Sequence, residues 1–275
     1  MTRRARTRAG LSIIEVLAVL AIVAVLISLM LPAIGTSREA ARRAACINNL
    51  RQISLALQNY EFSVNTLPPG VVDTRGPIGN RRDGLHIGWI VQLLPFMEQS
   101  YLSNAIDTRL SVYAIENTTA AVTTISSLAC PSDPETRSLP SRPGSSYAAC
   151  HHDVEAPIDV ANHGAFFLNS SVRHDGLTDG SSHTIFVGER TTRAWDTGGW
   201  MSGTRATLRN TGAPINAPAV ADAGLVGGYS SHHHDGANFA FGDGGVRFLR
   251  QGIDPEVYRR LGHRADGETI DEVPY

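Results

Sequence analysis

The sequence predicts an α+β protein in which one long N-terminal helix is followed by a mainly antiparallel β head. An almost unbroken apolar run begins at Leu11, and apolar residues then recur at spacings of three and four as far as Tyr60. Farther along, short β-prone runs alternate with turns, in a chain that contains 26 Gly and 14 Pro. A long helix and a strand-rich remainder therefore define the fold class.

Residues 11–34 are predicted to form a transmembrane helix. The segment has no charge from Val16 to Ile27, and at about 1.5 Å per residue it is long enough to cross a hydrocarbon core of about 30 Å. Arginines precede it, with no acidic residue before Glu15, so the N-terminus is expected in the cytoplasm. The sequence thus predicts a single-pass protein of the cell inner membrane, with its head in the periplasm or at the cell surface.

Two simpler interpretations of this segment remain open. An ordinary signal peptide would be cleaved after the apolar run, but no convincing Ala-x-Ala site follows Leu26 and the run exceeds the usual length. A plain signal anchor would explain the run but not Glu15. A charged residue costs about 2.5 to 3.5 kcal/mol at the centre of a membrane helix and less near its end, which makes Glu15 a candidate functional residue.

The residues around Glu15 resemble the cleavage and methylation signature of type IV prepilins and type II secretion pseudopilins. Gly10 is followed by Leu11, Ser12, two aliphatic residues and Glu15, with Leu11 standing where Phe is commoner. The resemblance implies that residues 1–10 are a leader, that a prepilin peptidase cuts after Gly10, and that Leu11 becomes the N-methylated first residue. A membrane-buried carboxylate needs a cation, which the new amino terminus of a neighbouring pilin-like subunit could supply to Glu15.

Residues 35–62 are predicted to extend the same helix as an amphipathic stretch. Its apolar stripe consists of Cys46, Leu50, Ile53, Leu57 and Tyr60. Polar residues, among them four arginines, lie outside this stripe. We expect the stripe to pack on the protein's own head.

Residues 63–275 are predicted to form an exported globular α+β head, since 42% of the chain is hydrophobic and 18% is charged. Four short β-prone runs are expected, at 164–168, 184–189, 237–241 and 246–249. The last two are joined by a Gly-Asp-Gly-Gly turn that favours a hairpin. The formal net charge is −2 and falls to −6 without the four leader arginines, so nucleic acid is not an expected partner.

The three cysteines belong to a chain that is expected in an oxidising compartment. Cys130 and Cys150 lie twenty residues apart, each beside a predicted turn, and are the expected disulfide pair. Cys46 would then be a buried thiol on the helical stripe. Three unpaired cysteines are the alternative.

Seven motifs are spread along the chain. They are Ala41 to Ile53, Leu67-Pro68-Pro69-Gly70, Gly88-Trp89, Leu93 to Gln99, Cys130-Pro131-Ser132-Asp133, Leu177 to Thr184, and a His233-x9-Asp243-Gly244 pattern. Together they resemble the pilin-like bacterial family catalogued as domain of unknown function 1559, over nearly the whole chain. The resemblance implies a type IV pilin-like fold with an exported α+β head, but no established biochemical activity.

Histidines and aspartates of the head are the candidate metal ligands, for zinc or for calcium. The histidine-rich runs are His151-His152-Asp153 and His232-His233-His234-Asp235. Because neighbours on a strand point to opposite faces, His232 and His234 are the two of the second run that could share a zinc ion. Asp175, Asp179 and Asp243 lie in Gly-rich segments of the kind that can bind calcium. Hydrogen bonding within turns is the alternative for all five residues, and no other cofactor is expected.

The sequence is interpreted as a structural and interaction protein rather than an enzyme. No Gly-x-Ser-x-Gly motif occurs, and Ser182 beside His183 says nothing about geometry. The predicted function is a membrane-anchored pseudopilin-like subunit of a type II secretion or type IV pilus-like assembly. Its expected partners are prepilin peptidase, other pilin-like subunits and membrane lipid. The alternative is a non-polymerising envelope protein whose head binds a ligand, a metal ion or a polysaccharide.

Overall fold

The computed structural model describes residues 12–138, 143–192, 198–218 and 224–268. The predicted leader over residues 1–10 and the predicted processing residues Gly10 and Leu11 lie outside these ranges. The chain divides into two compact units, Met1–Arg42 and Arg43–Tyr275. Helices and a mixed sheet occur together in the described residues, which confirms the predicted combination of α and β structure.

Helix α1 (Ile13–Val64) begins in the first unit. The backbone N–H of Ser12 donates to Oε2 of Glu15 at 2.9 Å. The carbonyl of Ser12 accepts from the backbone N–H groups of Glu15 and Val16. A serine followed three residues later by a glutamate has the spacing of a capping box. In the single chain, Glu15 therefore stabilises the first turn of α1.

The first turns of α1 expose apolar side chains all round the helix. The adjacent residues Ile13 and Ile14 are 80% and 74% exposed, and Ile22 is 61% exposed. Since adjacent helical residues point about 100° apart, these apolar side chains are not confined to one face but surround the helix. Within the described ranges, no helix combines the length and the apolar character that a membrane crossing requires, so the span predicted over residues 11–34 is not found there.

From Arg43 onward, α1 belongs to the second unit and is amphipathic. The buried side chains at the predicted spacing are Cys46, Leu50, Ile53 and Leu57. Asn49 fixes this part of the helix, because its Nδ2 donates to the carbonyl of Ala129 and to Oη of Tyr147, each at 3.1 Å. The predicted packing of the apolar stripe on the protein's own head is therefore confirmed.

The second unit is built around a five-stranded sheet in the order β5-β3-β4-β6-β7. The strands are β3 (Tyr147–His152), β4 (Ile185–Glu189), β5 (Leu208–Asn210), β6 (Gly236–Phe241) and β7 (Val246–Arg250). β3 and β5 are parallel, whereas the other neighbouring pairs are antiparallel. β6 and β7 form the predicted hairpin, and its turn places Gly244 at φ +82°. The run 164–168, which is described in full, is not a strand; Leu168 makes only an isolated bridge with Val71.

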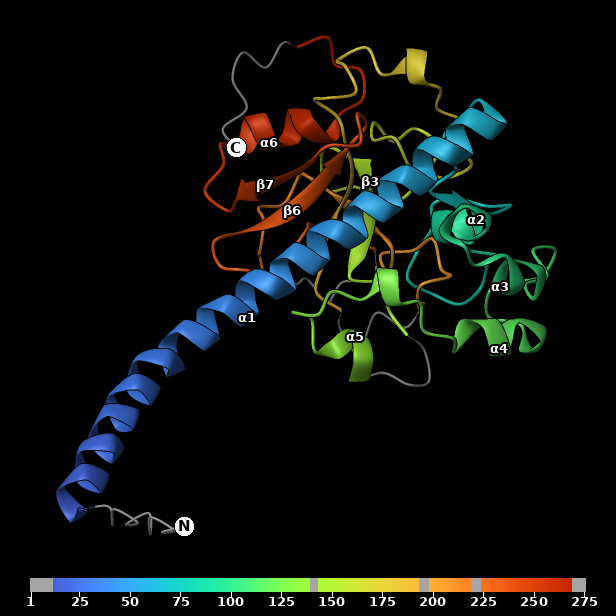
Figure 1. The fold of residues 1–275 in the computed structure, drawn as a ribbon. Coiled ribbons are helices and arrows are strands. Elements are labelled where there is room, and N and C mark those ends of the chain that lie inside the picture. Colours follow the sequence, from blue (N-terminus) through green and yellow to red (C-terminus); the bar gives the residue numbers. More distant parts are fainter. Residues whose placement is uncertain (1–11, 139–142, 193–197, 219–223, 269–275) are drawn as a thin grey trace, which may run out of the picture. The chain divides into compact units, whose positions relative to one another are not determined.

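The sheet separates two hydrophobic clusters. On β3, Tyr147 and Ala149 belong to the larger cluster, which includes the buried stripe of α1. Ala148 and Cys150 belong to the smaller cluster, which includes α6 (Pro255–Gly262). Alternation along β3 thus sends neighbouring side chains to opposite faces. In Figure 1, α6 is the red helix and the second half of α1 is drawn in lighter blue.

Short helices and two short strands complete the second unit. They are β1 (Val71–Val72), β2 (Ile87–Gly88), α2 (Trp89–Leu93), η1 (Leu94–Met97), α3 (Ser100–Asn104), η2 (Ile115–Asn117), α4 (Thr118–Ala121), η3 (Ser126–Leu128), α5 (Glu135–Ser138) and η4 (His174–Gly176). β1 and β2 pair antiparallel. Nε1 of the buried Trp89 donates to the carbonyl of Thr207 at 2.9 Å, which ties α2 to the segment before β5.

Candidate functional site

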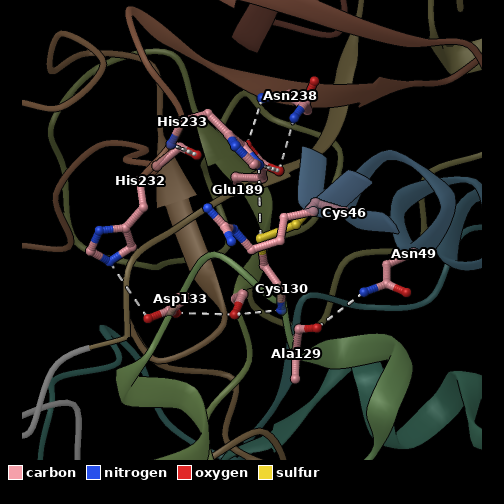
Figure 2. The surroundings of a disulfide bond; sticks show 12 residues. Cys46, Asn49, Ala129, Cys130, Asp133, Glu189, His232, His233 and Asn238 are labelled. Atoms are coloured by element: carbon pink, nitrogen blue, oxygen red, sulfur yellow. Dashed lines mark hydrogen bonds and ion pairs between the residues drawn. A yellow bond between two sulfur atoms is a disulfide. The ribbon is translucent and has the colours of Figure 1, made fainter. Parts of the chain in front are cut away.

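A disulfide between Cys46 and Cys130 fastens the second half of α1 to the head. The two Cα atoms are 5.1 Å apart, and 84 positions separate the residues in the sequence. The predicted disulfide between Cys130 and Cys150 is therefore wrong, as is the prediction that Cys46 carries a free thiol. Figure 2 shows the two sulfur atoms among several polar side chains.

The geometry of the sheet explains why Cys150 is the free thiol. Cys150 lies in the cluster on the α6 side of β3, whereas Cys46 and Cys130 lie in the cluster on the α1 side. Its Sγ donates to the carbonyl oxygens of His152 and Gly262, each at 3.6 Å. Burial raises the pKa of this thiol to about 12. The spacing of two cysteines does not reveal which face of a strand each one occupies, so the sequence did not exclude the wrong pair.

Two buried titratable side chains flank the disulfide. Nε2 of His233 is 3.9 Å from Sγ of Cys130 and 3.4 Å from Oε1 of Glu189. Asn238 on β6 holds the carboxylate of Glu189, because its backbone N–H and its Nδ2 donate to the two oxygens at 2.8 and 3.0 Å. We call Cys46, Cys130, His233 and Glu189 the disulfide centre (Figure 2). All four side chains are buried.

A second buried carboxylate, Asp133, organises the loop that carries Cys130. Its Oδ2 accepts hydrogen bonds from Oγ1 of Thr136, Oγ of Ser146 and the backbone N–H of Thr192, at 2.6, 3.0 and 3.0 Å. Oγ of Ser146 accepts in turn from the backbone N–H of Cys130 at 3.0 Å. This network holds the backbone at Cys130 in place, so that its sulfur faces α1.

The predicted zinc ligands His232 and His234 are not brought together with other ligands. Nε2 of His232 is 3.7 Å from Oδ1 of Asp133 (Figure 2), whereas His234 is exposed. Among the described residues, neither histidine belongs to a group of three or more potential metal ligands. The buried histidine between them, His233, is the one that faces other ligands.

The three predicted calcium ligands lie at three separate places. Asp175 is exposed beside an arginine. Asp243 lies in the β6–β7 turn; partial burial opposes its ionisation, but hydrogen bonds from an arginine of β7 and from a backbone N–H lower its pKa. Asp179 accepts from the backbone N–H of Asp266 at 2.7 Å and lies 4.0 Å from Nδ1 of His263. The structure therefore provides no shared site for Asp175, Asp179 and Asp243.

A second group of histidines surrounds the buried Asp153 just after β3. Its Oδ1 is 2.7 Å from Nδ1 of His152 and 2.9 Å from Nδ1 of His163, and Arg259 of α6 binds Oδ2 at 2.5 Å. Burial alone would raise the pKa of Asp153, but these three partners together hold it well below the usual range. The sequence pointed to His152 and Asp153. It did not indicate His163 or Arg259, which come from other segments of the chain.

The disulfide centre joins residues from motifs that are distant in the sequence. Cys46 comes from the first motif, Cys130 from the Cys-Pro-Ser-Asp motif, and His233 from the His-x9-Asp-Gly pattern. Glu189 was not singled out in the sequence. The sequence did contain a signal for it, because Glu189 is an acidic residue at the end of an apolar β-prone run. A carboxylate that such a strand buries needs hydrogen-bonding or charged partners.

One protein family has a model that matches residues 35–256, and its description is "Protein of unknown function (DUF1559)". No curated protein and no solved structure matches the chain. The matched range contains all four residues of the disulfide centre.

Proposed function

The chain belongs to the DUF1559 family of proteins of unknown function, and we propose that it acts as a pseudopilin-like structural subunit with a type IV pilin-like fold. In this proposal, prepilin peptidase removes residues 1–10 and Leu11 becomes the methylated N-terminus. The processed subunit then joins other pilin-like subunits in a type II secretion or type IV pilus-like assembly.

The apolar surface at the start of α1 is the observation that carries this proposal. Large aliphatic side chains are exposed at most positions between Ile13 and Ile27. A contiguous apolar surface of this kind marks an interaction with a membrane or with protein. We propose that membrane lipid covers this surface before assembly, and that the α1 helices of other subunits cover it afterwards.

The charge pattern and the disulfide support an envelope location for the proposed subunit. Arginines precede the apolar run, a distribution typical of a cytoplasmic N-terminus. The Cys46–Cys130 disulfide suits an oxidising compartment outside the cytoplasm. We therefore propose the inner membrane, with the head in the periplasm or at the cell surface.

The attachment of α1 to the head also supports a structural role. Besides the disulfide at Cys46, Asn49 makes two hydrogen bonds to the head, and the guanidinium of Arg43 lies 3.9 Å from the ring centre of Phe248. The second half of α1 is therefore attached to the head by a covalent bond and polar contacts as well as by hydrophobic packing.

Mass spectrometry of the N-terminal peptide tests the proposal directly. The protein is isolated from its native membranes, and we expect a chain that begins at methylated Leu11. The same protein produced in a strain without prepilin peptidase should keep its leader. A native chain that begins at Met1 or Thr2 would refute the proposed processing and, with it, the pseudopilin-like function.

A further inference from the structure

We propose that the disulfide centre is a metal site when its two cysteines are reduced, and that Cys46, Cys130, His233 and Glu189 then bind one zinc ion. This inference does not depend on the proposed function. It concerns the second unit of the chain alone, and its tests measure metal binding rather than processing or assembly.

The geometry of the centre suits a tetrahedral ion. One ligand atom from each of the four side chains lies within 4.8 Å of all the others. The separations of His233 Nε2 from Cys130 Sγ, 3.9 Å, and from Glu189 Oε1, 3.4 Å, are close to those in tetrahedral zinc sites. Bond lengths of about 2.0 to 2.3 Å place the ligand atoms of such a site roughly 3.3 to 3.8 Å apart. Cleavage of the S–S bond allows the two sulfur atoms to reach this separation.

The chemistry of the donors and their surroundings also favours zinc. Thiolate, imidazole and carboxylate are the usual protein ligands of zinc, and four protein ligands make a closed structural site rather than a catalytic one. Asn238 already orients Glu189 through two hydrogen bonds, as the partners of metal ligands commonly do. All four side chains are buried, so no ligand position is open to bulk water.

The two states of the centre are linked by a balanced redox step. A dithiol reductant, such as a thiol–disulfide oxidoreductase, transfers two electrons and two protons to the disulfide and becomes a disulfide itself. Zinc then displaces the two thiol protons and binds the thiolates, neutral His233 and ionised Glu189. For the return step, the disulfide form of such an oxidoreductase takes up two electrons from the two thiolates and two protons from water to become a dithiol, which re-forms the Cys46–Cys130 disulfide and releases the ion. Both states connect α1 to the head, so the attachment persists whether the compartment is oxidising or reducing.

Metal titration of the full chain in detergent tests the inference. The chain is reduced with a phosphine under anaerobic conditions, desalted, and titrated with zinc against a chromophoric chelator. We expect one zinc ion per reduced chain and none per oxidised chain. Cobalt in place of zinc should give the intense thiolate-to-metal absorption and the visible bands of a tetrahedral site. A reduced chain that binds no metal, or an oxidised chain that binds as well as the reduced one, would overturn the inference.

Four variants assign the ligands. His233→Ala and Glu189→Gln each leave three of the four protein ligands, so each should lower the zinc affinity of the reduced chain by at least about tenfold. Cys150→Ser and His232→Ala should leave the affinity unchanged, because Cys150 lies on the other face of the sheet and His232 pairs with Asp133. The inference fails if His233→Ala binds like the parent chain or if Cys150→Ser loses binding.

Thermal unfolding followed by circular dichroism covers the case in which reduction loosens the fold. Zinc should raise the melting temperature of the reduced chain, or refold it, and should not change that of the oxidised chain. A reduced chain that zinc neither stabilises nor refolds would contradict a site built from these four residues.

Discussion

Among individual residues, His151 has a pH dependence that follows from its burial on β3. Its Nδ1 is 3.1 Å from Oδ1 of Asn162, and its Nε2 has no partner among the described residues. Burial, together with the electrostatic effects of the nearby His152 and Arg209, lowers its pKa from 6.5 to about 3. The unfolded chain therefore takes up a proton near pH 6.5 that the folded chain accepts only near pH 3. Stability must fall as the pH is lowered between these two values.

We expect His151→Gln to make the free energy of unfolding less dependent on pH. Glutamine does not titrate and can still donate a hydrogen bond to Asn162, so up to about 1.4 kcal/mol per pH unit of the acid loss should disappear. Urea unfolding from about pH 7 to about pH 4 measures this. Part of the dependence of the unfolding free energy on pH should remain in the variant, because burial also lowers the pKa values of His86 and His263. The exposed His234→Gln is the matched control, and equal slopes for His151→Gln and the parent chain would refute the assignment.

A second residue-scale prediction concerns Gly10. Gly10→Leu should block removal of the leader, because a side chain at this position would crowd the cleavage site of the peptidase. We expect loss of most of the mature product, measured as the ratio of precursor to mature chain on immunoblots. Gly35→Leu is the control, since an added Cβ at Gly35 meets no atom within 4 Å. Normal processing of Gly10→Leu would count against a prepilin-type signal.

Single residues were predictable from the sequence where their role is local. Glu15 was recognised as unusual from its apolar neighbours, and its capping bond to Ser12 spans three residues. The partner of Cys130 was not predictable, because it depends on the face of β3 that Cys150 occupies and on the position of α1 against the sheet. His233 and Glu189 meet only after β4 and β6 have paired.

At the scale of elements, the second half of α1 permits a matched test of burial. Leu50 is fully buried in the larger cluster, whereas Leu55, on the same helix, is 58% exposed. Leu50→Ala should lower the free energy of unfolding by about 2 to 5 kcal/mol, through lost burial and a residual cavity. Leu55→Ala should change it by no more than about 0.5 kcal/mol. Denaturant unfolding with the disulfide intact gives both values, and equal losses would contradict the observed orientation of the helix.

Elements were predictable from the sequence to the extent that neighbouring residues determine them. The helical stripe and the β6–β7 hairpin depend on residues that are close in sequence, and both are observed. The run 164–168 has strand-like composition but does not pair as a strand, and only Leu168 bridges to Val71. The parallel pairing of β5 with β3 joins segments far apart in the chain, and no local pattern indicates it. Composition therefore predicts strand propensity, whereas pairing depends on the whole fold.

For the whole molecule, Glu15 has one role in the structure and a second in the proposed assembly, and experiment can separate the two. In the single chain, its carboxylate accepts the N–H of Ser12 and caps α1. In the proposed assembly, its charge pairs with the amino terminus of a neighbouring subunit. Both roles need an oxygen acceptor, but only the second needs a negative charge.

Comparison of Glu15→Gln with Glu15→Ala distinguishes these roles. Glutamine keeps the length of the side chain and an oxygen that can accept from Ser12, but it has no charge; alanine has neither feature. If an intersubunit ion pair holds the assembly together, the association constant between subunits should fall by at least about 100-fold in both variants. The reason is that removal of one partner of a buried ion pair costs about 3 to 5 kcal/mol. The assembled fraction is measured by chemical cross-linking in native membranes, with leader removal monitored as the control for correct folding and insertion. Normal assembly of Glu15→Gln together with failure of Glu15→Ala would assign Glu15 to helix capping alone, and normal assembly of both variants would remove Glu15 from the mechanism of assembly.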